Sequence, residues 1–550
     1  MTTTGALDTS VLIAGAGPVG LMTAVELRRR GIDVIVLEPR LTVAPWAKAV
    51  GVQPRTLELW DGVGVARDAL DAGMTMHGQL AFQDGEPSGR IDLTLPDDVP
   101  YRFIALPQYE TERILGARLR ESGTDVRRGW ELVDVAQDDS GVTATVRSPA
   151  GETSLRAAYL VGCDGAHSRV RKSLGLSFDG AAFAEEYMLA DVEVDWDLPT
   201  GYGVRSLRRT DGSVDDILVG IPLPGHKRYR MSMLVPDELR TAPADGGLAH
   251  GLEGGRAPEL HHIQAVLDRL SPRPTTASAM RWSSVFRISH RIVDRYSVGR
   301  VFVAGDAAHI HPPTGAQGMN TGIQDACNLG WKLAAAVRGR AAAGLLDSYH
   351  DERHPIGEEV VGRTVRAART GIGTGETLSF EQIVMREAQL LLGYPESALS
   401  AADVDAGWFT GGPAPGLRAP DAGGLRQDPV GAAFRWHELM RHPGHTLLLW
   451  VPDADGHRAA LDAATEIARA TAGDVRSRVV VARGVEIDDV SGITFRDASG
   501  TLAAAYGFAQ PGRLGAYLVR PDGYVGYRTA SLDVGHLLTH LQHTFVVAQR

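Results

Sequence analysis

Short apolar runs that alternate with helical patterns mark the first part of the chain. Residues 11–14 form an apolar run typical of a buried strand. Apolar residues then recur three and four positions apart over residues 21–27, which predicts a helix. Gly31 ends this helix, and residues 32–37 form a second apolar run. The order strand, turn, helix and strand predicts an α/β domain with a parallel sheet.

The turn between the first strand and the first helix carries three spaced glycines, in the sequence GAGPVG. Gly15 permits a tight turn, Gly17 lets the backbone approach a pyrophosphate, and Gly20 lets the helix pack closely on the strand. Glu38, at the tip of the second strand, can accept hydrogen bonds from ribose hydroxyls, and its charge disfavours a 2′-phosphate. FAD or NAD is therefore the expected ligand, bound by Gly15, Gly17, Pro18, Val19, Gly20 and Glu38.

A second junction of this kind, YLVGCDGAHSRVRKSLG, covers residues 159–175. Its apolar strand ends at Asp164, and the basic residues Arg169 and Arg171 follow. Taken alone, this segment fits an ordinary turn with a solvated basic helix start as well as it fits a ligand site.

A third junction, AGDAAHIHPPTGAQGMNTGIQDACNLGWKL, covers residues 304–333. An apolar run ends at Asp306, two prolines stiffen the next turn, and a helix is expected to start near Thr321. Glycine permits close approach of the backbone to a ligand, and a helix start favours negative charge. This stretch therefore looks built around a ligand, with Asp306, Pro313, Gly315 and Gly318 as candidate residues.

The three motifs, in this order and about 140 residues apart, resemble those of the single-component flavoprotein aromatic hydroxylases. This class is typified by para-hydroxybenzoate hydroxylase, and the resemblance covers about residues 10–370. The segments RAAYLVGCDG and HIHPPTGAQGMNTGIQDACNLGWKL look closest to the subgroup that hydroxylates aromatic polyketides and related antibiotics. The resemblance implies a Rossmann-like FAD-binding domain, and it implies roles for residues in the third motif.

Under this resemblance, Asp306 binds the ribityl or pyrophosphate region of FAD, and Pro313 lies against the reactive edge of the isoalloxazine. Backbone groups of the helix start face the pyrimidine end of the flavin, at Gly318, Met319 and Asn320. Reduced flavin carries negative charge at that end, which suits the positive end of a helix dipole.

Five further positions follow from the resemblance. Asp164 and Arg171 belong to a motif that serves both FAD and the nicotinamide cofactor. Gln108 contacts the adenosine side of FAD, and Arg113 is a weaker candidate on the same helix. Lys48 stands where the family commonly has an arginine that touches the flavin; lysine keeps the charge but loses the planar fork.

The resemblance also implies the reaction. NADPH or NADH reduces FAD, O2 adds to the flavin, and the flavin hydroperoxide transfers one oxygen atom to an aromatic, here polycyclic phenolic, substrate. Only one full dinucleotide fingerprint is present, since GIGTGE at Gly371 follows no strand, which argues against disulfide reductases and two-Rossmann Baeyer–Villiger enzymes. No catalytic acid or base can be assigned. The open alternatives are Baeyer–Villiger or epoxidising oxygenation, oxidative antibiotic inactivation, and a non-catalytic FAD-fold binding module.

The expected fold class is α/β, with a β-sheet substrate domain inserted into the FAD-binding domain and a thioredoxin-like domain at the C-terminus. The expected ranges are 1–177 and 290–400 for FAD binding, 178–289 for the substrate sheet, and 415–550 for the C-terminal domain. That last domain follows a βαβ…ββα order and has no cysteine, which excludes disulfide exchange. A packing or dimerisation role is expected, and a homodimer is one assembly consistent with it.

Composition narrows the partners and the compartment. The net charge of −11, without a long basic run, argues against nucleic acid and anionic membrane surfaces. No apolar run approaches the roughly 20 residues of a membrane span. Two cysteines form no disulfide framework, and the N-terminus carries no export signal, so a cytoplasmic location is expected.

Two histidine pairs, His309-x-His311 and His261-His262, are candidate metal ligands. No acid or cysteine cluster near either pair in the sequence completes a set at metal-ligand spacing. No metal site is therefore expected.

Overall fold

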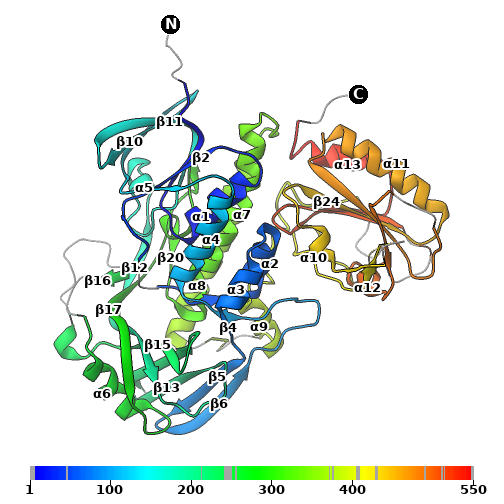
Figure 1. The fold of residues 1–550 in the computed structure, drawn as a ribbon. Helices are drawn as coiled ribbons and strands as arrows, with labels where there is room; N and C mark the ends of the chain where they lie inside the picture. Colours follow the sequence, from blue (N-terminus) through cyan, green and yellow to red (C-terminus); the bar gives the residue numbers. More distant parts are fainter. Residues whose placement is uncertain are drawn as a thin grey trace.

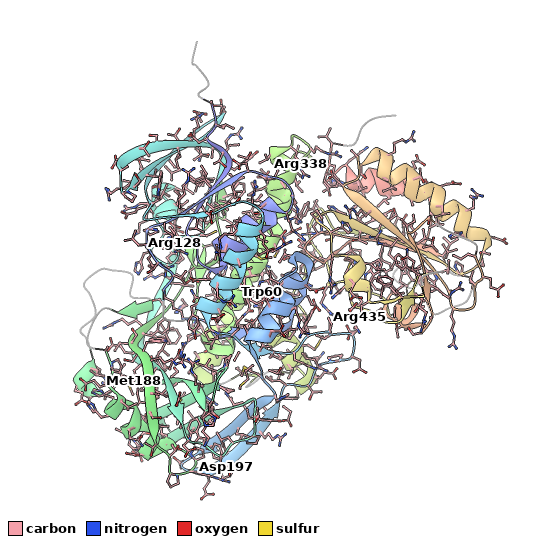
Figure 2. All side chains as sticks on the ribbon, in the orientation of Figure 1. Trp60, Arg128, Met188, Asp197, Arg338 and Arg435 are labelled. Atoms are coloured by element: carbon pink, nitrogen blue, oxygen red, sulfur yellow. The ribbon has the colours of Figure 1, made fainter. Side chains whose placement is uncertain are left out.

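The computed structural model shows three packed parts, and Figure 1 shows their arrangement. It describes residues 6–44, 48–211, 213–240, 251–253, 257–370, 372–373, 377–403, 409, 411–427, 431–487, 491–508, 512 and 514–546. We refer to the parts as the first domain, the sheet domain and the C-terminal domain. In Figure 2 they are marked by Trp60, Met188 and Arg435, respectively.

The first domain is built on a sheet with the strand order β18-β19-β11-β1-β2-β8. These strands are β18 (Ser297–Val298), β19 (Val301–Val303), β11 (Gly151–Gly162), β1 (Thr9–Ala14), β2 (Val34–Glu38) and β8 (Val126–Arg128). β1 pairs in parallel with β2 and β11, and β11 pairs in parallel with β19. The carboxyl ends of β1, β11 and β19 therefore lie at one edge of the sheet, which brings the three sequence motifs together.

Long helices cover this sheet and run through the centre of the molecule (Figure 1). They are α1 (Pro18–Arg28), α2 (Pro54–Val63), α4 (Gln108–Glu121), α7 (Gly318–Val337) and α8 (Ser348–Thr370). α1 packs against both α4 and α7. The close approach of α1 and α7 needs small residues, because a Cβ atom at Gly330 would lie 2.7 Å from Cβ of Glu26. Within the described ranges, no helix is long and apolar enough to cross a membrane.

The sheet domain is a nine-stranded sheet with the main order β16-β17-β12-β15-β14-β13-β5-β6. Its strands are β16 (Gly251–Glu253), β17 (Ala277–Ile292), β12 (Asp179–Val194), β15 (Arg228–Leu234), β14 (Ser213–Pro222), β13 (Tyr202–Thr210), β5 (Gly78–Gln83), β6 (Glu86–Asp92) and, paired with β17, β20 (His309–Ile310). The sheet is thus larger than the expected range 178–289, because β5 and β6 come from the first part of the chain. β6 is an exposed edge strand without apolar alternation, so its sequence gives no strand signal.

The C-terminal domain has a mixed sheet with the order β21-β28-β27-β24-β25-β26-β22-β23. Its core elements are β24 (His445–Val451), α11 (Asp455–Ala470), β25 (Val475–Val481), β27 (Gly515–Val519), β28 (Val525–Thr529) and α13 (Val534–Leu541). Alternate β24 residues enter two cores, with Leu447 and Leu449 on the α11 and α13 face and Leu448 and Trp450 on the other. The element order is the one expected from the sequence, and the thioredoxin-like assignment stays a prediction.

The C-terminal domain docks on α2 through ion pairs. Arg418 pairs with Glu58, and Arg441 pairs with Asp61 at 2.8 Å. The turn between β27 and β28 also reaches α2, where Arg55 donates to the backbone oxygen of Asp522 at 2.6 Å. Buried charges thus hold this domain against the first one.

Candidate functional site

The first glycine turn is shaped by its own packing and leaves one side open. A Cβ atom at Gly15 would lie 2.3 Å from the backbone oxygen of Cys163, and one at Gly20 would lie 2.0 Å from the oxygen of Gly15. Apart from its two chain neighbours, no atom of the described residues lies within 4 Å of the corresponding position at Gly17. Gly15 and Gly20 are therefore needed for the fold, whereas Gly17 faces open space at the N-terminus of α1, and its contact with a pyrophosphate stays a prediction.

Glu38 is held as an anion at the end of β2. Its side chain accepts hydrogen bonds from the Ala16 N–H at 3.0 Å and from Nε of Arg40 at 2.7 Å. Burial opposes ionisation, but these hydrogen bonds hold the pKa of Glu38 below its usual range. A charged carboxylate beside the glycine turn suits the predicted contact with ribose hydroxyls.

The start of α4 carries the next two predicted residues. Gln108 accepts a hydrogen bond from the Ala49 N–H at 3.2 Å and donates to Glu112 at 2.8 Å. Arg113 pairs with Glu110 at 2.7 Å and is 57 % exposed. Gln108 thus joins the start of α4 to the backbone at Ala49, next to the predicted adenosine site. Arg113 lines the cavity between α4 and the sheet domain.

Lys48 lies on the loop that leads to α2. Its side chain is exposed, and its backbone oxygen accepts from Nη1 of Arg230 at 3.4 Å. Residues 45–47, which precede it, lie outside the described residues. The contact of Lys48 with the flavin stays a prediction.

The second motif is tied to the third one. Asp164 accepts from the N–H groups of Arg169 and Val170, at 2.6 and 3.1 Å, at the start of α5 (Arg169–Ser173). Arg171 is buried and donates to the backbone oxygen of Ala307 at 3.1 Å. Its guanidinium also lies 3.8 Å from the ring centre of Phe178. Asp164 therefore shapes its own turn and Arg171 reaches the third motif, while their role toward a nicotinamide cofactor stays a prediction.

Asp306 lies on the 3-10 turn Gly305–Ala307, directly after β19. Its side chain is half-buried and has no hydrogen-bond or ion-pair partner among the residues that the structure describes. The turn approaches α1 closely, because a Cβ atom at Gly305 would lie 2.8 Å from Cγ2 of Val19. An unpaired carboxylate beside the glycine turn is available to accept hydrogen bonds from a hydroxylated chain such as ribityl.

The turn from Pro313 to Asn320 presents backbone rather than side chains. Gly315 has φ of +72°, a conformation that favours glycine. The Asn320 side chain is used internally, since it accepts from the Gln53 N–H at 2.9 Å and donates to the Ala316 oxygen at 2.7 Å. The N–H groups of Gly318, Met319 and Asn320 lie in the first turn of α7, and their contact with the flavin stays a prediction.

α7 begins at Gly318, three residues before the expected start near Thr321. The sequence hides this boundary, because Gln317 provides no side-chain cap and glycine is a poor helix former. The earlier start places Gly318, Met319 and Asn320 in the first helical turn, whose N–H groups lack intrahelical acceptors.

Sequence reasoning missed a buried ion pair behind this turn. Asp325 of α7 and Arg353 of α8 are both 0 % exposed, and Nε of Arg353 donates to Oδ1 of Asp325 at 2.7 Å. The available signal was the spacing of Thr321, Asp325, Asn328 and Lys332, which places these four polar residues on one face of the helix.

A cavity of about 720 Å³ lies between α4 and the sheet domain. Its lining includes Tyr109, Arg113, Arg128, Arg228, Arg281 and Trp282. Asp191 also lines the cavity, and its carboxylate accepts from Nε of Arg230 at 2.5 Å and from the Trp282 indole at 2.8 Å. Figure 2 places Arg128 in the first domain, on the side toward the sheet domain. This cavity has room for an aromatic compound beside the nucleotide site.

The histidine pairs require one correction. The structure brings Glu238 to His261 and His262, an acid that the sequence did not place, with their ligand atoms within 4.8 Å. However, Nδ1 of His262 accepts from the Glu259 N–H at 2.9 Å, so its proton resides on Nε2, which faces Glu238 at 2.9 Å. A protonated nitrogen cannot bind a metal, and these hydrogen bonds account for the cluster without one.

Comparisons with known proteins agree with this geometry. Residues 8–364 match the family model described as "FAD binding domain". A 12-dehydrotetracycline 5-monooxygenase/anhydrotetracycline 6-monooxygenase from Streptomyces rimosus is 33 % identical, with 96 % of each chain covered. Among solved structures, the flavin-dependent monooxygenase PieE in complex with FAD and substrate has a TM-score of 0.78 at 25 % identity, covering 98 % of this chain and 100 % of that one. Aklavinone-11 hydroxylase with FAD and aklavinone has a TM-score of 0.74 at 28 % identity, covering 98 % and 99 %.

Proposed function

Because this chain belongs to the FAD-binding monooxygenase family, as an FAD-dependent aromatic hydroxylase, we propose that its substrate is a polycyclic phenol of the polyketide or antibiotic type. Relatives that span nearly the whole chain carry names referring to tetracycline precursors and aklavinone, which are such compounds.

The observation that carries the proposal is the convergence of three turns on one place. Val19, from the glycine turn, contacts the Gly305 turn and also α7, where a Cβ atom at Gly322 would lie 2.6 Å from its Cγ2. Arg171 bonds to the same Gly305–Ala307 turn. An elongated ligand with a pyrophosphate at α1 and a flat anionic ring at α7 fits this arrangement, and FAD is such a ligand.

Different residues then contact different parts of the cofactor. The open N-terminus of α1 beside Gly17 receives the pyrophosphate, and Glu38 accepts hydrogen bonds from the ribose. Asp306 accepts hydrogen bonds from the ribityl hydroxyls. The N–H groups at the start of α7 stabilise negative charge at the pyrimidine edge, next to Pro313. When bound, FAD supplies the electron transfer and the oxygen activation.

The substrate occupies the sheet-domain side of the cavity, because Tyr109 and Arg113 on its α4 side lie beside the predicted adenosine contact Gln108. Trp282 offers an aromatic surface there, and Arg228 and Arg281, which also line the cavity, favour an anionic phenolate. NADPH or NADH is the proposed visiting reductant, served by the Asp164 and Arg171 motif. Exclusion of water by the sheet domain would protect the activated oxygen from wasteful loss.

The direct test starts from purified protein with bound flavin. Anaerobic mixing with NADPH and with NADH should bleach the flavin absorbance, and polycyclic phenols should accelerate the bleaching. Under an atmosphere of labelled O2, the product should gain one labelled oxygen atom, which mass spectrometry detects. Protein that never binds FAD, or bound flavin that neither reductant bleaches in the presence of any phenol, would contradict the proposal.

A further inference from the structure

A polar stripe runs along the buried face of α7. Thr321, Asp325, Asn328 and Lys332 follow one another at intervals of four, three and four residues, and all four are fully buried. The stripe faces α8, which packs beside α7 in the centre of Figure 1. Buried charges are costly unless they are paired, so the partners of this stripe indicate its role.

Asp325 is bonded to two segments of the third motif at once. Its Oδ2 accepts from the Gly305 N–H at 3.1 Å and lies 2.8 Å from Nε2 of His309. Gly305 begins the turn that carries Asp306, and His309 lies in β20, shortly before Pro313. One carboxylate oxygen therefore connects α7 to both turns that face the predicted flavin.

Arg353 occupies the other oxygen of the same carboxylate. Its remaining donors bond to the Tyr394 hydroxyl at 2.9 Å and to the Thr321 backbone oxygen at 3.1 Å. Burial opposes ionisation of Asp325, but Arg353 and His309 lower its pKa to about 2. The carboxylate is thus anionic at neutral pH, with both oxygens engaged.

We propose that Asp325 is a positioning residue of the flavin site: it fixes the Gly305–Ala307 turn and the His309 segment against α7, and Arg353 locks it in place. The inference rests on the proposed FAD site. Asp325 does not itself touch the cofactor, because its oxygens are used by protein donors. It holds the segments that carry Asp306 and Pro313 at fixed positions relative to the N–H groups at the start of α7.

A neighbouring ion cluster provides the matched control. Glu352, next to Arg353 on α8, is also 0 % exposed and pairs with Lys332 at 2.7 Å and with Arg520. Among the described residues, its partners are Asn328, Lys332, Ser397 and Arg520, and none of these belongs to the turns of the third motif. Glu352→Gln therefore makes the same acid-to-amide change at the same helix interface without touching the link to the flavin turns.

The test compares Asp325→Asn with Glu352→Gln in the full chain. Asp325→Asn should raise the Kd for FAD by about tenfold to a hundredfold, as expected for losing hydrogen bonds to a charged group. At saturating FAD, it should also shift the visible absorption spectrum and the midpoint potential of the bound flavin. Glu352→Gln should lower the Tm but leave the Kd, spectrum and potential unchanged.

A second variant covers the case in which Asp325→Asn does not fold. His309→Phe keeps the Asp325–Arg353 pair and an aromatic ring beside Tyr296 and His311, while it removes the bond from Asp325 to the His309 segment. It should fold and show the same direction of change in FAD affinity and flavin spectrum. Arg353→Lys, which keeps the charge, should bind FAD more tightly than Arg353→Met.

The outcomes separate two failures. Wild-type protein that does not bind FAD would overturn the proposed function itself. Wild-type protein that binds FAD, with Asp325→Asn or His309→Phe equal to wild type in Kd, spectrum and potential, would overturn only the positioning role. Equal FAD defects in Asp325→Asn and Glu352→Gln would also overturn it, because they would reflect general loss of packing.

Discussion

Arg520 of the C-terminal domain forms a two-pronged ion pair with Glu352 of α8, with N–O distances of 2.6 and 2.8 Å. Both side chains are buried, with exposed fractions of 2 % and 0 %. Glu352 also accepts from Lys332, so charges from the C-terminal domain and two central helices meet in one cluster. The C-terminal domain is therefore joined through buried charges to the layer formed by α7 and α8.

Removing Arg520 should destabilise the whole protein. Arg520→Met leaves Glu352 and Asp522 buried with fewer positive partners, and breaking a buried pair in this way costs about 3–5 kcal/mol. We expect urea unfolding to show this loss. Arg441→Met is the control, since the Arg441–Asp61 pair is at the domain boundary and Arg441 is 45 % exposed. It should cost less than about 1 kcal/mol, and equal losses in the two variants would argue against a special role for the cluster.

The buried carboxylate of Glu58 should make the free energy of unfolding depend on pH. Burial opposes its ionisation, but Arg418, His437 and Arg55 lower its pKa from 4.5 to about 2. The folded-state pKa lies below the unfolded one, so the stabilisation is present above the unfolded pKa and is lost as the pH falls toward 2. A shift of this size corresponds to about 3 kcal/mol.

Urea unfolding at a series of pH values checks this expectation. Wild-type protein should lose stability as the pH drops below about 4.5, whereas Glu58→Gln should be less stable at neutral pH and flatter across the acid range. Glu121→Gln, which changes an exposed partner of Arg118, should behave like wild type. Parallel pH curves for wild type and Glu58→Gln would contradict the assignment.

Trp282 offers a test of the substrate cavity. Its indole lines the cavity, donates to Asp191, and lies 4.8 Å from the guanidinium of Arg230. Trp282→Ala should lower kcat/KM for the phenolic substrate by about tenfold or more, because stacking surface and the Asp191 contact are lost together. The Kd for FAD should stay within about twofold of wild type. A change in FAD affinity with unchanged kcat/KM would place the substrate elsewhere.

The parts of the site that the sequence could predict are local in the chain. Gly15, Gly17 and Gly20 sit within one strand–turn–helix unit, so their spacing alone indicates the turn. Such features depend on residues only a few positions apart.

The parts that could not be predicted depend on contacts between distant segments. Asp325 and Arg353 lie on different helices, and Arg520 comes from another domain, so no spacing rule joins them. Glu238 reaches His262 in the same way. The edge strand β6 is polar because solvent, not a core, surrounds it. Long-range packing, rather than local propensity, decides these features.

Substitutions at Gly17 and Gly20 should separate the effect on FAD binding from the effect on folding. At Gly17, a methyl group would meet no atom of the described residues within 4 Å, apart from its two chain neighbours, and φ is −73°, which any residue adopts. Gly17→Ala should therefore leave the Tm of the apoprotein unchanged while raising the Kd for FAD by at least about tenfold, because the methyl group occupies the pyrophosphate space. At Gly20, a methyl group would lie 2.0 Å from the Gly15 oxygen, so Gly20→Ala should lower the Tm of the apoprotein itself. Thermal melts without FAD and fluorescence titration with FAD distinguish the two effects. If Gly17→Ala bound FAD as tightly as wild type, the open space beside α1 would not be the pyrophosphate site.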